Sequence, residues 1–175
     1  MYRKTNETEI VVELGGETKI GTGVGFYDHM LELFAFRSGL GLRIEAKGDL
    51  IVDPHHTIED VGITLGMVLA EELGDKKGIA RYGSARIPMD ECLAQVDLDI
   101  SGRPFLVWNA DIRDEMIEEF FRALAFNAGI TLHVNLLYGK NEHHKCEAVF
   151  KAFGAAMKQA LIKTGDRIES TKGVL

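Results

Sequence analysis

The chain has 175 residues, of which 46% are hydrophobic and 27% charged, enough for one compact unit or for two small halves that share a core. Its net charge of -7 argues against binding nucleic acid or an anionic membrane, because both partners need a basic surface. No apolar run approaches the roughly 20 residues of a membrane-spanning helix, and the first residues lack the apolar core of a signal peptide. We therefore expect a cytoplasmic protein.

Two cysteines, Cys92 and Cys146, are too far apart in sequence to form a CxxC pattern. A disulfide between them would be fortuitous, and we expect reduced thiols.

Hydrophobic periodicity predicts five elements in each half of the chain. The first half is expected to form strands at 7–14 and 17–23, a helix at 25–36, a strand at 41–48 and a helix at 57–74. The second half is expected to form strands at 91–100 and 104–112, a helix at 115–127, a strand at 130–139 and a helix at 142–163. Both halves therefore read strand, strand, helix, strand, helix.

The two halves also share residues at nearly constant spacing. "DPHHTIEDVGITLG" begins at residue 53 and "NEHHKCEAVFKAFG" at residue 141, and "AFRSGLGLRI" at 35 matches "AFNAGITLHV" at 125. Earlier in each half, Glu7 matches Glu91. We interpret this as an internal duplication, with repeats at 1–80 and 81–175 that form one unit. The predicted fold class is α+β, a duplicated β-β-α-β-α unit with sheets on one side and helices on the other.

Each histidine pair precedes a glutamate by three or four positions. On a helix, residues four apart diverge by about 40° and residues three apart by about 60°, so Glu59 lies near both His55 and His56 in direction. Adjacent histidines diverge by about 100°, which makes it hard for both to bind one ion. This geometry indicates two metals, each bound by more than one segment. For a single pair, solvated polar residues at a helix start are an equally good interpretation, which the second copy weakens.

The chain has six histidines, and His29 and His133 lie outside the pairs. Taken alone, each of these two is better explained as a hydrogen-bonded structural histidine. With the pairs and the two glutamates they give eight groups, four for each metal. Imidazole and carboxylate without thiolate suit manganese, iron or zinc. Cys146 lies inside the second motif, but the first copy has Ile58 there, which favours a packing role.

The ordered motifs resemble imidazoleglycerol-phosphate dehydratase, a family of histidine biosynthesis. The resemblance runs through "GFYDHML", "GDLIVDPHHTIEDVGI", "DISGRP", "EFFRALAFNAGITLH", "GKNEHHKCEAVFKAFG" and "STKGVL", and covers nearly the whole chain. It implies a dehydratase with two Mn²⁺ per active site, a fold like domain 2 of ribosomal protein S5, and a shell of twenty-four subunits with active sites between protomers. Because no phosphatase segment precedes the first motif, we expect the monofunctional form.

The resemblance also assigns roles to residues. The implied metal ligands are His29, His55, His56, Glu59, His133, His143, His144 and Glu147. The same histidines of the first half, with Glu59, are expected near the substrate. Further implied substrate contacts are Glu7, Arg81, Arg103, Lys151, Ser170, Thr171 and Lys172. Arginine, lysine and hydroxyl groups are suitable donors to a phosphate in an acidic protein, although single surface arginines and a frayed tail are common. Glu7 is the candidate acid or base, because it is not needed as a ligand; an ordinary exposed strand residue is the competing interpretation.

Three features depart from the family pattern: Arg37 and Ser38 near the end of the first helix, a shortened segment before Glu118, and "DPHH" in place of "DDHH". They bear on substrate contacts and assembly more than on the metal centre.

Two other classes of protein remain open. A two-metal phosphatase or amidohydrolase usually has bridging aspartates, whereas here Asp28, Asp53 and Asp60 only flank the histidines. A ferritin-like metal store draws Glu-x-x-His ligands from four long helices, whereas this chain interleaves strands and has the opposite ligand order. A test for dehydration of imidazole glycerol phosphate separates the three.

Overall fold

A computed structural model describes residues 1–175. The first half contains β1 (Tyr2–Lys4), β2 (Thr8–Leu14), β3 (Lys19–Gly21), α1 (Gly25–Ser38), β4 (Leu42–Gly48) and α2 (His55–Leu73). The second half contains β5 (Tyr82–Met89), β6 (Cys92–Asp99), β7 (Phe105–Asn109), α3 (Glu115–Ala128), β8 (Thr131–Tyr138) and α4 (Glu142–Ala160). The α+β class and the duplicated pattern are confirmed.

Each half has one edge strand that periodicity did not predict. The sheets have the orders β1-β2-β4-β3 and β5-β6-β8-β7, so β1 and β5 occupy equivalent edges. β1 has only three residues, and β5 contains Pro88, which an edge strand tolerates because one side of its backbone needs no partner. Both strands pair antiparallel with their neighbours, β2 and β6.

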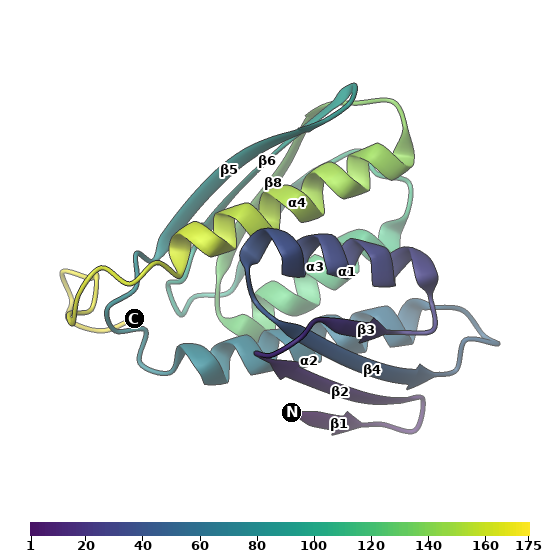
Figure 1. The fold of residues 1–175 in the computed structure, drawn as a ribbon, viewed down its shortest axis with the longest axis horizontal. Coiled ribbons are helices and arrows are strands. Elements are labelled where there is room, and N and C mark those ends of the chain that lie inside the picture. The colour runs from purple at the N-terminus through teal and green to yellow at the C-terminus, as the bar shows by residue number, and fades with distance from the viewer.

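The helices cover one face of each sheet. Along β2, Thr8, Ile10 and Val12 are buried while the alternate side chains are more exposed, and β6 alternates in the same way. The two halves meet through their helices, with α2 against α3 and α1 against α4, so the sheets form the outer layers (Figure 1). One cluster of 39 buried residues runs through both halves, which makes them one compact unit.

The glycine in each repeated motif allows two helices to approach closely. A Cβ at Gly154 of α4 would lie 2.8 Å from the Phe34 carbonyl oxygen of α1, and one at Gly66 of α2 would lie 2.6 Å from the Leu124 carbonyl oxygen of α3. These contacts with backbone atoms leave no room for a side chain.

We expect Gly154→Ala to lower the free energy of unfolding by about 1–3 kcal/mol, because the added methyl group must separate α4 from α1. Urea denaturation of the metal-free protein measures this. Gly21→Ala is the control, since no atom lies within 4 Å of a Cβ at that position. An unchanged midpoint for Gly154→Ala would contradict the close helix contact.

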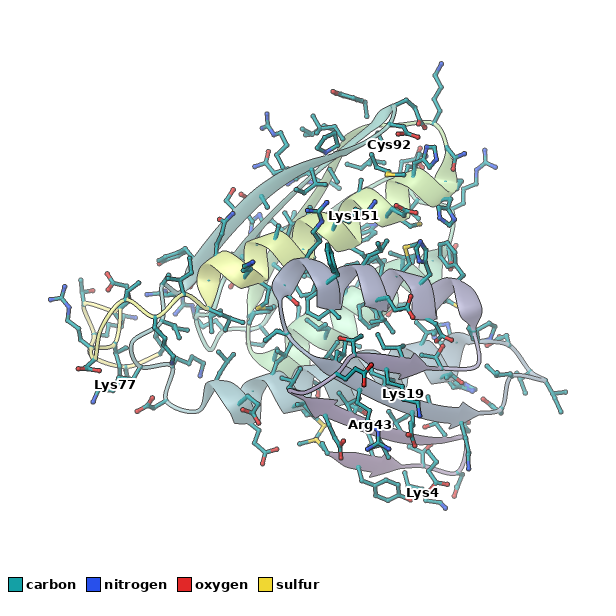
Figure 2. All side chains as sticks on the ribbon, in the orientation of Figure 1. Lys4, Lys19, Arg43, Lys77, Cys92 and Lys151 are labelled. Atoms are coloured by element: carbon teal, nitrogen blue, oxygen red, sulfur yellow. The ribbon has the colours of Figure 1, made fainter.

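Both cysteines are buried and unpaired. Burial raises the pKa of the Cys146 thiol to about 12. Cys92 lies near the start of α4 (Figure 2), where its thiol is 3.8 Å from the Asn141 carbonyl oxygen. Cys146 packs in the hydrophobic core, as expected from its isoleucine counterpart.

We therefore expect neither thiol of the folded protein to react with a disulfide reagent at pH 8, because the thiolate is both scarce and inaccessible. Absorbance at the reagent's wavelength should report two thiols per chain only after denaturant is added. Rapid labelling of the folded protein would contradict this burial.

No helix is both long and apolar enough to cross a lipid bilayer.

Candidate active site

One cluster of potential metal ligands joins α1 to α4. The Nε2 atoms of His29 and His143 lie 3.2 and 2.9 Å from the same carboxylate oxygen of Glu147. The Glu147 side chain is only 10% exposed and also accepts a hydrogen bond from Lys151. Burial alone would raise the pKa of Glu147, but the hydrogen bonds from Lys151, His29 and His143 outweigh it and lower that pKa to about 2. The Glu147 side chain is therefore a carboxylate anion.

The local sequence explains why α4 begins just before its histidines. Asn141 occupies the position before the helix, and its side-chain oxygen accepts hydrogen bonds from the backbone N–H groups of His143 and His144. The two imidazoles then leave the first turn in different directions, with ring planes at 83° and centroids 6.5 Å apart. His143 faces the cluster with His29, whereas His144 turns away from it toward β6.

The first-half motif shows the same divergence at the start of α2. The rings of His55 and His56 are 6.1 Å apart at 87°. His55 Nε2 lies 3.9 Å from Glu59 Oε2, while His56 Nδ1 lies 3.0 Å from Asp49 Oδ2 and 3.9 Å from Glu7 Oε2. The hydrogen bond with Asp49 raises the pKa of His56.

His133 lies apart from the other histidines. It is on the exposed face of β8, in a small cleft with Tyr82 and Asp97, whereas its neighbours Leu132 and Val134 point into the core. Within one chain the structure therefore brings His29, His143 and Glu147 together, and leaves His133 outside that cluster.

The expected phosphate contacts form an open pocket of about 690 Å³ at the other end of the molecule. Its lining includes Arg81, Arg103, Ser170, Thr171 and Lys172, all of which the sequence indicated. The tail that contributes three of them follows α4 and loops back beside the start of β5 (Figure 1). Arg167 also lines this pocket and was missed, because it lies outside the "STKGVL" motif.

The two arginines of this pocket differ in how firmly they are held. The Arg81 Nε donates to Asp99 at 2.6 Å, one Nη donates to the Glu169 carbonyl oxygen at 2.7 Å, and the hydrogen bond with Asp99 raises its pKa. Arg81 thus orders the tail. The Arg103 side chain is 66% exposed, and its Nη2 lies 3.6 Å from Asp99, so it is freer to bind an anion.

The Lys151 side chain is turned toward the cluster of His29, His143 and Glu147. It is labelled on α4 in Figure 2 and donates to Glu147 and to the Met89 sulfur. It therefore compensates the negative charge of Glu147.

Two further carboxylates, Asp49 and Glu91, contact the paired histidines and were not singled out from sequence. The signal for Glu91 was present in the repeat, because it is the counterpart of Glu7. Asp49 had no such signal.

A duplicated α+β fold with imidazole and carboxylate groups at one end and a basic pocket at the other defines a candidate metal-binding enzyme for an anionic substrate.

Comparison with known proteins gives the family. The imidazoleglycerol-phosphate dehydratase family profile matches residues 22–157. The chain is 55% identical to the imidazoleglycerol-phosphate dehydratase of Acetivibrio thermocellus, over 99% of this chain and 96% of that one. The chain belongs to the imidazoleglycerol-phosphate dehydratase family, whose members are hydro-lyases of histidine biosynthesis.

Solved structures agree. The Pyrococcus furiosus imidazoleglycerol-phosphate dehydratase superposes with a TM-score of 0.89 at 43% identity, covering 100% of both chains. The Staphylococcus aureus enzyme superposes with a TM-score of 0.84 at 47% identity, covering 94% of this chain and 98% of that one.

Proposed function

We propose that the chain binds two Mn²⁺ per active site and removes water from D-erythro-imidazole glycerol phosphate to give imidazole acetol phosphate. The observation that carries this proposal is the convergence of His29, His143 and Glu147 from two helices. Their three ligand atoms lie within 4.8 Å of one another, close enough to face one ion. Imidazole and carboxylate donors fit manganese, and both thiols are buried outside the cluster.

The eight proposed ligands are His29, His55, His56, Glu59, His133, His143, His144 and Glu147. In one chain His29, His143 and Glu147 lie together, whereas His133 and the proposed phosphate pocket lie elsewhere. His143 is at the start of α4, whereas Arg81 donates its backbone N–H to Ala160 at the end of that helix. α4 has 19 residues, which corresponds to roughly 28 Å.

This separation supports an active site completed by neighbouring subunits. A phosphate held near Arg81 in one chain is too far from that chain's own His143 for a small substrate to span the gap. His133 lies in a cleft next to Asp99, the partner of Arg81, and so could join a neighbour's cluster. We propose a cytoplasmic homo-oligomer of twenty-four subunits, with each subunit built from repeats at 1–80 and 81–175.

Substrate contacts are proposed for both ends of this composite site. Arg81, Arg103, Ser170, Thr171 and Lys172 would hold the phosphate, with guanidinium, ammonium and hydroxyl donors. His29, His55, His56, Glu59 and Lys151 would face the imidazole end. Neither the phosphate contacts nor the imidazole contacts include Arg37, Ser38 or the shortened segment before Glu118.

The reaction removes a hydroxyl group next to the imidazole ring and a proton from the following carbon. Bound metal ions would lower the proton affinity of the ring. Glu7 is the proposed acid or base, which takes the carbon-bound proton, after which the enol product becomes the ketone. Its side chain is 55% exposed and lies next to His56 without being tightly bonded to it, so it can reach a bound substrate.

The function is tested by incubating manganese-loaded protein with imidazole glycerol phosphate and detecting the ketone product. Formation of that product supports the dehydratase over a metal-store or hydrolase role. Release of inorganic phosphate, or no reaction with metal bound, would contradict it.

A further inference from the structure

The two halves hold their second histidine in the same way but with carboxylates from different places. In the second half, His144 Nδ1 lies 2.8 Å from Glu91 Oε2, just before β6. In the first half, His56 Nδ1 lies 3.0 Å from Asp49 Oδ2, just after β4. Glu7, the counterpart of Glu91, is 3.9 Å from the His56 ring and too far for a hydrogen bond.

Glu91 is held firmly enough to orient a ring. Its Oε1 accepts hydrogen bonds from the backbone N–H groups of Lys140 and Asn141, at 3.2 and 2.7 Å, and from the Cys92 thiol. Its other oxygen is therefore directed at His144.

The place that Asp49 occupies in the first half is taken by a basic residue in the second. Gly48 pairs with Thr8, and Gly139 lies against Cys92, the counterpart of Thr8. Asp49 follows Gly48, whereas Lys140 follows Gly139 and offers no carboxylate. Each half therefore supplies one carboxylate to Nδ1 of its second histidine. In the first half it follows β4, and in the second half it precedes β6.

Three other histidines turn Nε2 toward the proposed ligand carboxylates. His29 and His143 present it to Glu147, and His55 presents it to Glu59. When Nδ1 of His56 or His144 donates to a carboxylate, Nε2 is the deprotonated nitrogen that can bind a cation.

We propose that Asp49 and Glu91 are positioning residues that fix the Nδ1–H form of His56 and His144 and point Nε2 at the metals. In the first half Asp49, and not the Glu91 counterpart Glu7, holds the second histidine, and this difference has a functional consequence. Because Asp49 holds His56, the Glu7 carboxylate is left free for the substrate, whereas its counterpart Glu91 is fully occupied. The inference rests on the proposed metal centre and adds to it the residues that orient two of its ligands.

The test is a calorimetric titration of metal-stripped protein with Mn²⁺. Removing a carboxylate that orients a metal-binding histidine typically weakens the metal by about 10–100-fold. We expect Asp49→Ala and Glu91→Ala each to weaken Mn²⁺ binding to this extent. Asp49→Asn and Glu91→Gln should lose less Mn²⁺ affinity, because the amide oxygen can still accept a hydrogen bond from Nδ1–H. Glu7→Ala should leave Mn²⁺ affinity unchanged, although it occupies the same repeat position as Glu91.

Glu13→Ala, which removes an exposed carboxylate on β2, controls for net charge. Circular dichroism of the metal-free variants shows whether they are folded. If Glu91→Ala fails to fold because the Lys140 and Asn141 N–H groups lose their acceptor, Asp49→Ala and Glu91→Gln still decide the question. Folded variants that bind Mn²⁺ as tightly as the wild type would overturn this inference and leave the proposed metal centre standing. Absence of Mn²⁺ binding by the wild type would overturn the proposed metal centre, and this inference with it.

Discussion

Replacing Glu7 by glutamine is expected to lower kcat by about 10²–10⁴-fold, the usual contribution of a positioned acid or base. Glutamine keeps the size of the side chain and cannot exchange a proton in the same way. Mn²⁺ content should stay at the wild-type value, because Asp49 and not Glu7 is bonded to His56. Steady-state kinetics and elemental analysis of the same preparation measure both quantities.

Glu9→Gln is the matched control for this prediction. Glu9 is two residues further along the same chain segment, and its carboxylate contacts only Tyr2 and Lys4 on the exposed face. Its substitution should leave kcat near the wild-type value. A Glu7→Gln enzyme with normal turnover would remove Glu7 from the mechanism.

Replacing Glu147 by alanine is expected to lower kcat/KM by at least about 10³-fold, since the metal contributes several kcal/mol and each 1.36 kcal/mol is a factor of ten. Glu147 is the group on which His29 and His143 converge. Without it, the neighbouring Lys151 ammonium loses its partner and repels a cation. Elemental analysis should show Mn²⁺ content falling by about one ion per subunit.

Glu142→Ala tests whether any acidic residue at the start of α4 has this effect. Glu142 contacts Lys145 and Arg113 and no histidine. The Glu142→Ala protein should therefore retain the Mn²⁺ content of the wild type. Two tightly bound ions in folded Glu147→Ala protein would contradict the assignment of Glu147 as a ligand.

The sequence predicted much of this protein because the same histidine and glutamate motif occurs in both halves of the chain. Two HHxxE motifs in matched helices fix the direction of each side chain relative to its helix, since helical geometry is local. The divergence of adjacent histidines follows from the same geometry, and the structure shows ring planes nearly perpendicular in both pairs. The order of the four helices and of β2, β4, β6 and β8 followed from periodicity, because each of these has a buried face.

The edge strands β1 and β5 were not predicted from periodicity. β1 has only three residues, and β5 has eight but only two buried residues. Both are defined by their pairing with β2 and β6. The partners of the histidines were also beyond local reasoning. His29 and Glu147 are 118 residues apart, and only the packing of α1 on α4 brings them within 3.2 Å.

The tertiary structure alone decided which carboxylates serve the second histidines. Sequence comparison makes Glu7 and Glu91 equivalent, yet only Glu91 is bonded to its histidine. The reason is local to each half: Asp49 follows Gly48 and reaches His56, whereas Lys140 follows Gly139 and instead donates its backbone N–H to Glu91. A repeat in the sequence fixes which residues are available, and packing around each copy decides what each of them contacts.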